Sequence, residues 1–535
     1  DIVEGTSLNI PGLTGQVLNV IRKSSGISGQ FDYGARFRTD DVAYQWGQFD
    51  LSVSGGNDAL NWTVGLENGQ FRGGEEGLEL VTDAAGRVID RRDEAQLFYG
   101  DEPQLSGSLR WYRDGGDILN VNGQIGGNLF RGRETSLRQA PDAPARLRRF
   151  RNRENEFNYE LGGDYEFALG PGRLKLIALR SYEDSPTLTR VDVDFNVETG
   201  EDRPLEGSRF SRDADEAETI ARAEYGFTRG DADWQVSLEG ALNSLAIDSA
   251  FAERETNGDL QNIPFPGATA KVEEKRGEIS LSYGRPLAPD LTLQSSLGGE
   301  YSTITQSGPA GKTRSFIRPK GFIALAWAAA TGLDISARLE REVGQLNFFD
   351  FIASVNLNND TVNVSNADLV PSQSWNSEIE VTQSLGSYGS VTARGYYQAI
   401  SDIVDQVPIG LTGEAPGNLD SARRYGIEWN STFLGDPIGW TGAKLDIELQ
   451  LQRSRLDDPL TGEPRSISFG LLRDLEVDFR YDIPTSDWAV GAFWENRKEA
   501  AQVRLDSIFE QYESPGFIQV FAEHKDIFGL TVRGA

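Results

Sequence analysis

The chain has 535 residues and is strongly acidic, with 82 aspartates and glutamates against 52 lysines and arginines and a formal net charge of −30. Such a field repels phosphate backbones, so we expect no nucleic acid partner. Cysteine and methionine are both absent, which excludes a disulfide framework, thiolate metal sites and a cysteine nucleophile. The longest fully apolar run, residues 322–330, is far shorter than the roughly 20 residues of a membrane-spanning helix. Membrane-spanning strands need only about 9 to 11 residues and stay possible.

The opening segment differs from the rest of the chain. Residues 1–27 carry glycines and a proline around a short apolar run, residues 17–21, and do not alternate cleanly. We therefore interpret residues 1–27 as a separate small piece. From Ser28 onward apolar and polar residues alternate with the two-residue period of a strand, and residues 31–37 are the first example.

The remainder reads as that lone strand followed by ten hairpins. Each hairpin consists of two alternating runs joined by a short turn, most of them rich in glycine, proline, asparagine or aspartate. The predicted hairpins are residues 49–53 with 60–66, 105–111 with 119–129, 157–167 with 174–180, 217–227 with 234–242, the two halves of 278–301, 320–329 with 333–339, 374–385 with 391–400, 421–433 with 445–455, 475–481 with 488–494, and 517–524 with 530–534.

The connections between the hairpins are long, polar and charged, and we expect them to be loops. They cover residues 71–102, 131–154, 184–216, 248–270, 343–372 and 402–420. Short turns and long loops therefore alternate, as they do in outer-membrane barrels with short periplasmic turns and long extracellular loops. This asymmetry predicts an all-β fold, a large antiparallel transmembrane β-barrel.

The two faces of each predicted strand fit a membrane barrel. In residues 445–452, for example, apolar side chains alternate with Asp446, Glu448 and two glutamines. A packed core could not hold so many unpaired carboxylates, so we expect the polar face to line a wide, wet lumen. Aromatic residues near strand ends suit interfacial girdles, although ordinary strand aromatics are the simpler alternative. These aromatics are Trp62, Trp111, Tyr283, Tyr301, Trp488 and Trp494.

The hairpin at residues 278–301 can be oriented in this scheme. Pro286 and Pro289 break the chain between its two runs and mark the periplasmic end. We expect Tyr283 and Tyr301 near opposite membrane interfaces. The side chains predicted to touch lipid are Ile279, Leu281, Leu291, Leu293 and Leu297, and those predicted to face the lumen are Glu278, Ser280, Gln294 and Glu300.

The strand count is informative. One lone strand and ten hairpins give about 21 strands, whereas bacterial single-chain barrels have an even number. We therefore expect about 22 strands, with residues 28–535 forming a barrel that stops before its closing strand.

Three stretches carry a resemblance to a known family. Residues 9–21 look like the last strand of that family's plug domain. Residues 366–372 (NADLVPS), before Trp375 and Glu378, resemble its pattern of a leucine, a proline and a strand with glutamate. Residues 418–428 (NLDSARRYGIE) are similar to its late-barrel segment. Over nearly its whole length the chain resembles the TonB-dependent outer-membrane receptors.

The resemblance implies a 22-strand barrel in the outer membrane of a Gram-negative bacterium, filled by an N-terminal plug. Residues 1–27 would be the C-terminal remnant of that plug. The family's partners would be outer-membrane lipid and lipopolysaccharide, a small-molecule ligand, and the TonB energy-transducing complex, reached through an N-terminal segment that these residues lack. The ligand of this chain stays unknown at this point.

The sequence offers little for catalysis, and we predict no catalytic residue, no cofactor and no metal site. His524 is the only histidine, so histidine-based triads and soft metal sites are not available. A pair of carboxylates could form a hydrolase site, but abundant lumen acids give such pairs by chance. The arginine-rich residues 146–153 could bind an anionic ligand or lipopolysaccharide phosphates, and a solvated, charge-balanced loop is the simpler interpretation.

Three functions remain open. The first is energised import of a scarce nutrient, either a siderophore or other metal chelate or an oligosaccharide. The second is a passive porin-like channel. The third is an outer-membrane adhesin or an enzyme on a barrel scaffold.

Overall fold

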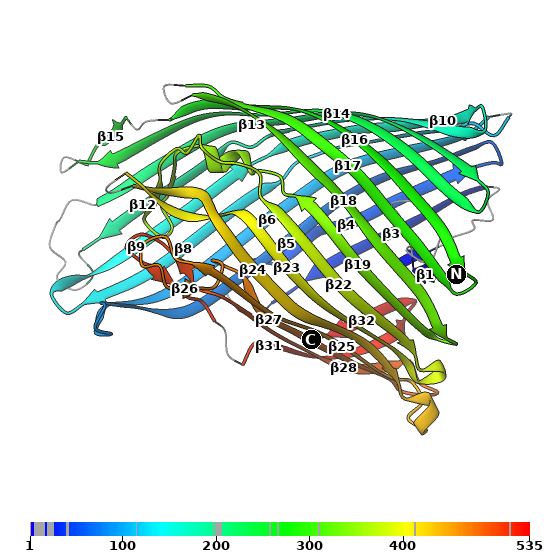
Figure 1. The fold of residues 1–535 in the computed structure, drawn as a ribbon. Coiled ribbons are helices and arrows are strands. Elements are labelled where there is room, and N and C mark those ends of the chain that lie inside the picture. The colour runs from blue at the N-terminus through cyan, green and yellow to red at the C-terminus, as the bar shows by residue number, and fades with distance from the viewer. Residues whose placement is uncertain are drawn as a thin grey trace.

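The computed structural model describes residues 2–4, 16–18, 26–38, 42–113, 115–195, 197, 206–255, 258–264, 267–308, 311–410, 413–512 and 515–535. These residues form an all-β molecule whose strands wind into one wide barrel (Figure 1). Within them, the only helices are three short 3₁₀ turns, η2 (Phe348–Phe351), η3 (Gly386–Tyr388) and η4 (Asp436–Ile438). No described helix is long and apolar enough to cross a membrane.

One antiparallel sheet of 26 strands makes up the barrel wall and its extensions. Apart from five extension strands, 21 strands follow one another around the wall, which confirms the predicted fold class. They are β3 (Gly26–Arg36), β4 (Gln45–Gly56), β5 (Leu60–Thr82), β6 (Val88–Tyr112), β7 (Ile118–Gly126), β10 (Phe157–Leu169), β11 (Gly172–Asp184), β13 (Glu206–Arg229), β14 (Ala232–Arg254), β16 (Thr269–Ala288), β17 (Leu291–Gln306), β18 (Lys312–Ala330), β19 (Leu333–Val343), β22 (Gln373–Ser384), β23 (Gly389–Ile409), β24 (Gly413–Leu434), β25 (Ala443–Asp457), β27 (Leu471–Asp482), β28 (Trp488–Glu499), β31 (Phe517–Ile527) and β32 (Leu530–Gly534).

The extension strands lie at the end of the barrel opposite the short turns, as the labels of β8, β9, β12 and β15 in Figure 1 show. They are β8 (Leu129–Ala140), β9 (Ala143–Asn155), β12 (Thr187–Asp194), β15 (Leu260–Ile263) and β26 (Pro464–Arg465). Three short ladders stand apart from the sheet, β1 (Ile2–Glu4) with β2 (Gln16–Leu18), β20 (Ser354–Asn356) with β21 (Thr361–Asn363), and β29 (Gln502–Val503) with β30 (Ile508–Phe509).

The long connections of the barrel are present, but the expectation that they are loops is wrong for most of them. β5 and β6 stay paired from Leu60 opposite Trp111 out to Thr82 opposite Val88, through the region predicted as a loop. The same holds for residues 131–154, 184–216, 248–270 and 402–420, which are largely strand. Outside the membrane neither face of a strand needs a continuous apolar series, so the sequence loses its alternation while the backbone ladder continues. Cross-strand ion pairs such as Arg92–Glu79, 2.7 Å apart, support these hairpins.

The hairpin formed by β16 and β17 has the predicted orientation. Its register places Leu281 opposite Leu297 and Glu278 opposite Glu300, so apolar and polar pairs lie on opposite faces. The Leu297 side chain is 73% exposed on the outer surface, whereas Gln294 on the lumen side is 1% exposed. An outward apolar belt exposed over a whole barrel is the surface that a membrane covers.

Aromatic side chains mark the two borders of that belt. Near the short turns Trp234 and Tyr283 meet edge to face with ring centroids 4.7 Å apart, and Trp488 meets His524 in the same way at 4.8 Å. Toward the other end Tyr159 stacks on Tyr182 at 5.6 Å. These positions suit interfacial girdles.

Most of residues 1–27 lies outside the described residues. Gly26 and Ile27 begin β3, and the other described residues there are the two strands of the β1–β2 ladder, with Ile2 opposite Leu18 and Glu4 opposite Gln16. The division into a plug remnant at 1–27 and a barrel at 28–535, and the closing strand, therefore stay predictions.

The outward face can be tested with one substitution. Leu297→Arg places a charge in the apolar belt several residues from the β16–β17 turn, and we expect it to lower the free energy of unfolding by about 2 to 4 kcal/mol. Ser280→Arg on the lumen face of the same hairpin is the matched control, with an expected change below about 1 kcal/mol. Reversible urea unfolding in phospholipid vesicles measures both values. Equal destabilisation by the two variants would contradict the orientation.

Candidate functional site in the barrel lumen

The connection between β19 and β22, residues 344–372, folds back into the barrel, and we call it the lumen loop. It contains η2 and the small β20–β21 ladder and lies within the wide end of the barrel in Figure 1, as a yellow-green segment. The sequence correctly indicated a segment without barrel strands here, but not its inward course.

The lumen loop rests on an apolar patch of the inner wall. Phe351 and Leu369 from the loop are 2% and 1% exposed and belong to one buried cluster with wall side chains. The wall side chains at its centre are Leu245 on β14, Val272 on β16 and Ile304 on β17. Burying a side chain of this size contributes about 1.5 to 3 kcal/mol, so the patch holds the loop firmly.

The sequence signal for this patch is a change of phase. On β14, Leu238 and Leu242 face outward, whereas Leu245 and Ile247 farther along the strand are buried on the inner face. The apolar residues thus change from even-numbered, outward positions to odd-numbered, inward positions where the strand leaves the membrane. The outward apolar series alone does not reveal this switch.

An arginine clamp on β9 holds the tip of the lumen loop. Arg148 is buried, and its Nη1 lies 3.0 Å from Glu134 Oε1 on β8. Its Nη2 donates hydrogen bonds to two carbonyl oxygens of the loop, that of Leu357 and that of Asn358, the latter at 2.9 Å. Asp360 Oδ1 lies 3.6 Å from the same Nη2. The loop tip is therefore tied to the extracellular hairpin β8–β9 by hydrogen bonds to a charged group, which are among the stronger ones.

The returning half of the loop is tied to the opposite wall. Asn418 accepts a hydrogen bond from the Val370 amide at 2.8 Å and donates to the Val370 carbonyl oxygen at 2.9 Å. Asn363 Oδ1 accepts from Gln406 at 2.6 Å and from Arg504 at 2.9 Å. Two of the sequence motifs, residues 366–372 and 418–428, therefore meet in the structure.

Burial shifts the ionisation of the groups around the clamp. It raises the pKa of Glu134 above its usual range, an effect to which Glu94 adds and which Arg148 opposes. Burial and the Arg148 charge lower the pKa of Arg138 to about 10. In the loop itself, burial raises the pKa of the Asp350 carboxyl. The clamp therefore holds its charges at a cost in solvation.

An acidic cavity of about 520 Å³ lies between the inner wall and the start of the lumen loop. Carboxylates from neighbouring strands line it together with Asn347 and Phe348 of the loop, and no lysine or arginine is among its described lining residues. These carboxylates are Glu160, Glu183, Glu216, Glu218 and Glu274. Such a cavity favours positively charged or neutral groups.

A smaller cavity of about 240 Å³ lies inside β19 to β25 around an arginine. Arg394 on β23 lies 2.6 Å from Glu428 on β24 and 3.2 Å from Glu378 on β22. Glu378 and Glu428 are the glutamates of the two family-like motifs, so the structure brings both to one ion-pair network. The charge of Arg394 is paired with those of the two glutamates, so the network links neighbouring strands of the inner wall.

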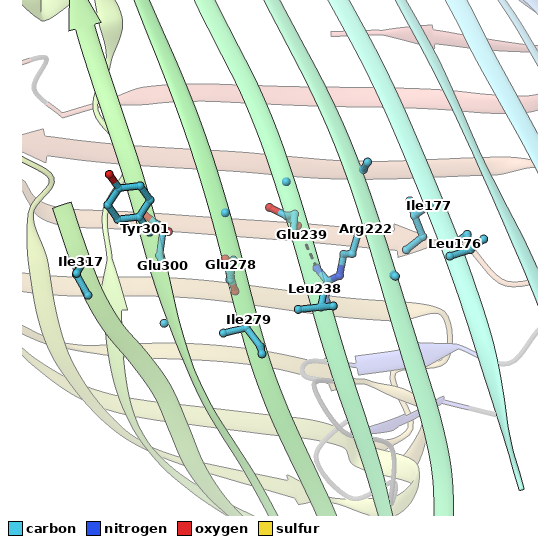
Figure 2. Close-up of a pocket in the computed structure, with 15 residues that line it drawn as sticks. Leu176, Ile177, Arg222, Leu238, Glu239, Glu278, Ile279, Glu300, Tyr301 and Ile317 are labelled. Atoms are coloured by element: carbon cyan, nitrogen blue, oxygen red, sulfur yellow. Dashed lines mark ion pairs between the residues drawn. The ribbon is translucent and has the colours of Figure 1, made fainter. Parts of the chain in front are cut away.

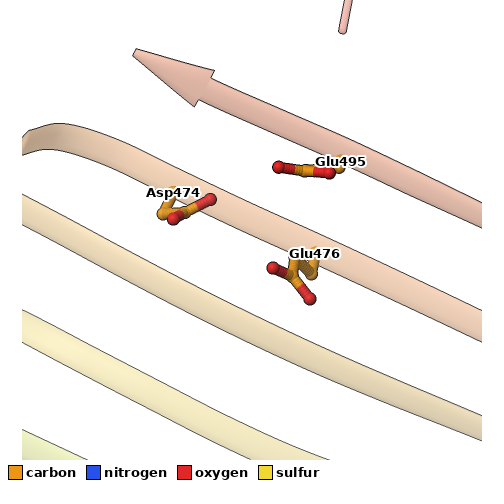
Figure 3. Close-up of side chains that lie close together, drawn as sticks. All are labelled: Asp474, Glu476 and Glu495. Atoms are coloured by element: carbon orange, nitrogen blue, oxygen red, sulfur yellow. The ribbon is translucent and has the colours of Figure 1, made fainter. Parts of the chain in front are cut away.

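A third acidic group lies on the inner face of β27 and β28. The carboxylates of Asp474, Glu476 and Glu495 approach within 4.8 Å of one another (Figure 3). Asp474 also pairs with Arg497 at 2.9 Å. Like charges opposite one another on neighbouring strands are unfavourable, and a wet lumen reduces that cost.

A groove of about 840 Å³ lies on the outside of the barrel and not in the lumen (Figure 2). Glycines form its floor, among them Gly240, Gly277 and Gly299, because they carry no side chain. The larger side chains of Leu238, Ile279 and Tyr301 stand around this floor. The groove belongs to the apolar belt. A ligand that passes through the lumen does not reach it.

The structure separates the arginines of residues 146–153. Arg146 pairs with Asp90 at 2.7 Å and Arg148 with Glu134, both inside the hairpin wall, whereas Arg151 and Arg153 are exposed on the outer face. The run is therefore a strand with two different faces and not a solvated loop. His524 lies on the outer face beside Trp488, away from the lumen cavities.

The clamp is tested by removing its arginine. Arg148→Met leaves Glu134 and two loop carbonyls unpaired, which we expect to weaken loop docking by about 3 to 5 kcal/mol. Hydrogen exchange measured by mass spectrometry should then show faster exchange of amides 354–363. Arg151→Met, on the outward face of the same strand, should leave that exchange unchanged. Slow exchange in the Arg148 variant would show that the clamp does not hold the loop.

The pH dependence of docking follows from Asp350. Its pKa is raised in the docked loop, so the neutral carboxyl stabilises docking at low pH, and that contribution is lost as pH rises through the raised pKa. A nitroxide on a cysteine that replaces Val362 should become more mobile as pH rises from about 4. Asp350→Asn should remove this change. A pH response identical in both proteins would argue against Asp350.

Comparisons with known proteins agree with this architecture. No protein-family model and no curated protein sequence matches the chain. Among solved structures, the copper transporter OprC matches with a TM-score of 0.58 and 12% identity over 99% of this chain and 80% of that one. The siderophore receptor PiuA from Acinetobacter baumannii gives 0.59 and 9% over 97% and 78%. The ferric yersiniabactin uptake receptor FyuA from Yersinia pestis gives 0.54 and 12% over 95% and 73%.

At these identities the likeness is one of fold, and it confirms the resemblance read from the sequence. The chain itself has a wall of 21 described strands, an outward apolar belt and a polar lumen. The chain therefore has the fold of the TonB-dependent outer-membrane receptors, a membrane-spanning β-barrel of the Gram-negative outer-membrane type.

Proposed function

We propose that the protein is an outer-membrane receptor that imports a scarce nutrient by energised transport. The observation that carries this proposal is the wide barrel with its lumen loop, held by an apolar patch and by the Arg148 clamp. Porins of 16 to 18 strands leave an aqueous channel, whereas barrels of about 22 strands belong to transporters with a filled lumen. A passive channel is the second candidate, because porins also conduct through polar lumens.

The acidic cavity narrows the ligand class. Five glutamates line it, and the basic side chains near them, Arg212 beside Glu216 and Arg276 beside Glu274, are not among its described lining residues. A metal complex that carries cationic or neutral groups, or a neutral oligosaccharide, suits this lining better than an anionic chelate. The names of three structural neighbours, a copper transporter, a siderophore receptor and a ferric yersiniabactin uptake receptor, support a metal-containing ligand.

Energy coupling belongs to the same proposal. The TonB complex would act through an N-terminal segment of the receptor, and outer-membrane lipid would surround the apolar belt. An adhesin or enzyme has less support, since the neighbours are transporters and receptors.

Uptake in cells tests the proposal. Gram-negative cells that make the natural full-length protein should accumulate ⁵⁵Fe or ⁶⁴Cu from at least one member of a panel of cationic, neutral and anionic complexes. Uptake should stop when an uncoupler collapses the proton-motive force. Cells without the gene are the control. Uptake that continues at the same rate with the uncoupler would contradict energised import and favour a passive channel.

A further inference from the structure

A row of arginines crosses the outer face of the extracellular hairpins. Arg133 on β8 lies opposite Arg151 on β9, Arg151 lies opposite Arg190 on β12, and Arg190 lies opposite Arg209 on β13. Side chains directly opposite on neighbouring strands have their Cβ atoms about 4.5 to 5.5 Å apart. Four guanidinium groups therefore stand side by side on four adjacent strands.

The row faces away from the lumen. Phe150, Val191 and Phe210 occupy alternate positions on β9, β12 and β13 and are buried in one cluster with Leu357 of the lumen loop. Successive side chains of a strand point to opposite faces. Arginines next to these three residues in sequence therefore point outward, toward whatever surrounds the extracellular part of the barrel.

More arginines adjoin the row. Two residues along the same pair of strands, Arg131 on β8 lies opposite Arg153 on β9. Arg149 lies on β9 on the other side of Arg151. Burial, and after it the charge of Arg153, lowers the pKa of Arg131, whose guanidinium also donates to the carbonyl oxygens of Phe130 and Glu154. The patch comprises Arg131, Arg133, Arg149, Arg151, Arg153, Arg190 and Arg209.

Carboxylates balance only part of this charge. Asp192 lies 2.9 Å from Arg190 and is shared with Arg254 at the same distance, and Asp194 lies 4.0 Å from Arg149. Within the described part of the chain, Arg133, Arg151, Arg153 and Arg209 make no ion pair. Like charges opposite one another destabilise a sheet, and here they occur in a protein of net charge −30. An external anion would remove that cost.

The distance of the patch from the short turns of the barrel indicates what surrounds it. Arg209 lies about 20 residues along β13 from the turn that follows Arg229. At about 3.3 Å per residue and a tilt of about 40°, this distance corresponds to roughly 50 Å, compared with about 25 Å for the apolar band of such barrels. The patch therefore lies well above the membrane surface, at the level of the saccharides attached to outer-leaflet lipid.

We propose that this patch binds the phosphorylated saccharide core of lipopolysaccharide. Guanidinium groups pair with phosphates through two parallel hydrogen bonds, and a row of four suits a chain of phosphates better than one small anion. The site lies on the opposite face of the wall from the lumen cavities, so it goes beyond the proposed import function. It anchors the extracellular hairpins in the surrounding layer.

A binding experiment on the natural protein in phosphatidylcholine nanodiscs tests this site. The probe is phosphorylated core oligosaccharide released from lipopolysaccharide, titrated by calorimetry. Arg133→Ala with Arg151→Ala should weaken binding at least about tenfold, because two charge-assisted pairs are lost. Arg91→Ala is the matched control. Arg91 lies on β6 of the same extracellular wall and already pairs with Asp93 at 2.8 Å, so its loss should change affinity less than about twofold.

Two further probes separate the sources of phosphate. Oligosaccharide from which the phosphates have been removed should bind at least about tenfold more weakly than the phosphorylated form. Inorganic phosphate should bind far more weakly than the oligosaccharide. Arg151→Gln alone serves if the double variant does not fold, with a smaller loss expected. Equal affinity of wild type and arginine variants, equal affinity for the dephosphorylated probe, or binding of inorganic phosphate alone would overturn the proposal.

Discussion

The structure depends on one constraint, that each wall strand separates two media while all its backbone groups stay paired. Lipid offers no hydrogen-bond partner, so a sheet can cross a membrane only as a ladder of neighbouring strands. The outward side chains must then be apolar, and the inward ones can be charged because water fills the lumen. The β16–β17 hairpin shows both kinds of side chain, with Leu281 opposite Leu297 on its outward face and Glu278 opposite Glu300 on its inward face.

Beyond the membrane the constraint is relaxed, and the strands acquire other tasks. On β14 the apolar series moves from the outward Leu242 to the inward Leu245, and the inner wall becomes the support for the lumen loop. On β9 the inward Arg148 holds the loop, whereas the outward Arg151 joins the arginine patch. One strand thus serves the lumen with one face and the cell surface with the other.

These two regimes explain how much the sequence could predict. The alternation at residues 278–301 was sufficient to orient that hairpin, and the count of 21 strands agrees with the described wall. Residues 71–102 were expected to be a loop, because a strand wet on both faces carries no alternating pattern. The lumen loop depends on contacts between distant residues, such as Arg148 with Asn358, which no local pattern reveals. The meeting of Glu378 and Glu428 at Arg394 is equally non-local, although both glutamates belong to motifs that the sequence shows.

The central claim, that the wall meets lipid with one face and water with the other, can be measured directly because the chain contains no cysteine. Single cysteines placed in turn at residues 295–305 of β17 would carry nitroxide labels in vesicles. Power-saturation spectroscopy would compare their accessibility to oxygen, which concentrates in lipid, and to a water-soluble nickel chelate. The account predicts oxygen accessibility at odd positions up to Tyr301 and loss of that preference near Ile304. Uniform accessibility to the nickel chelate along the whole strand would contradict it.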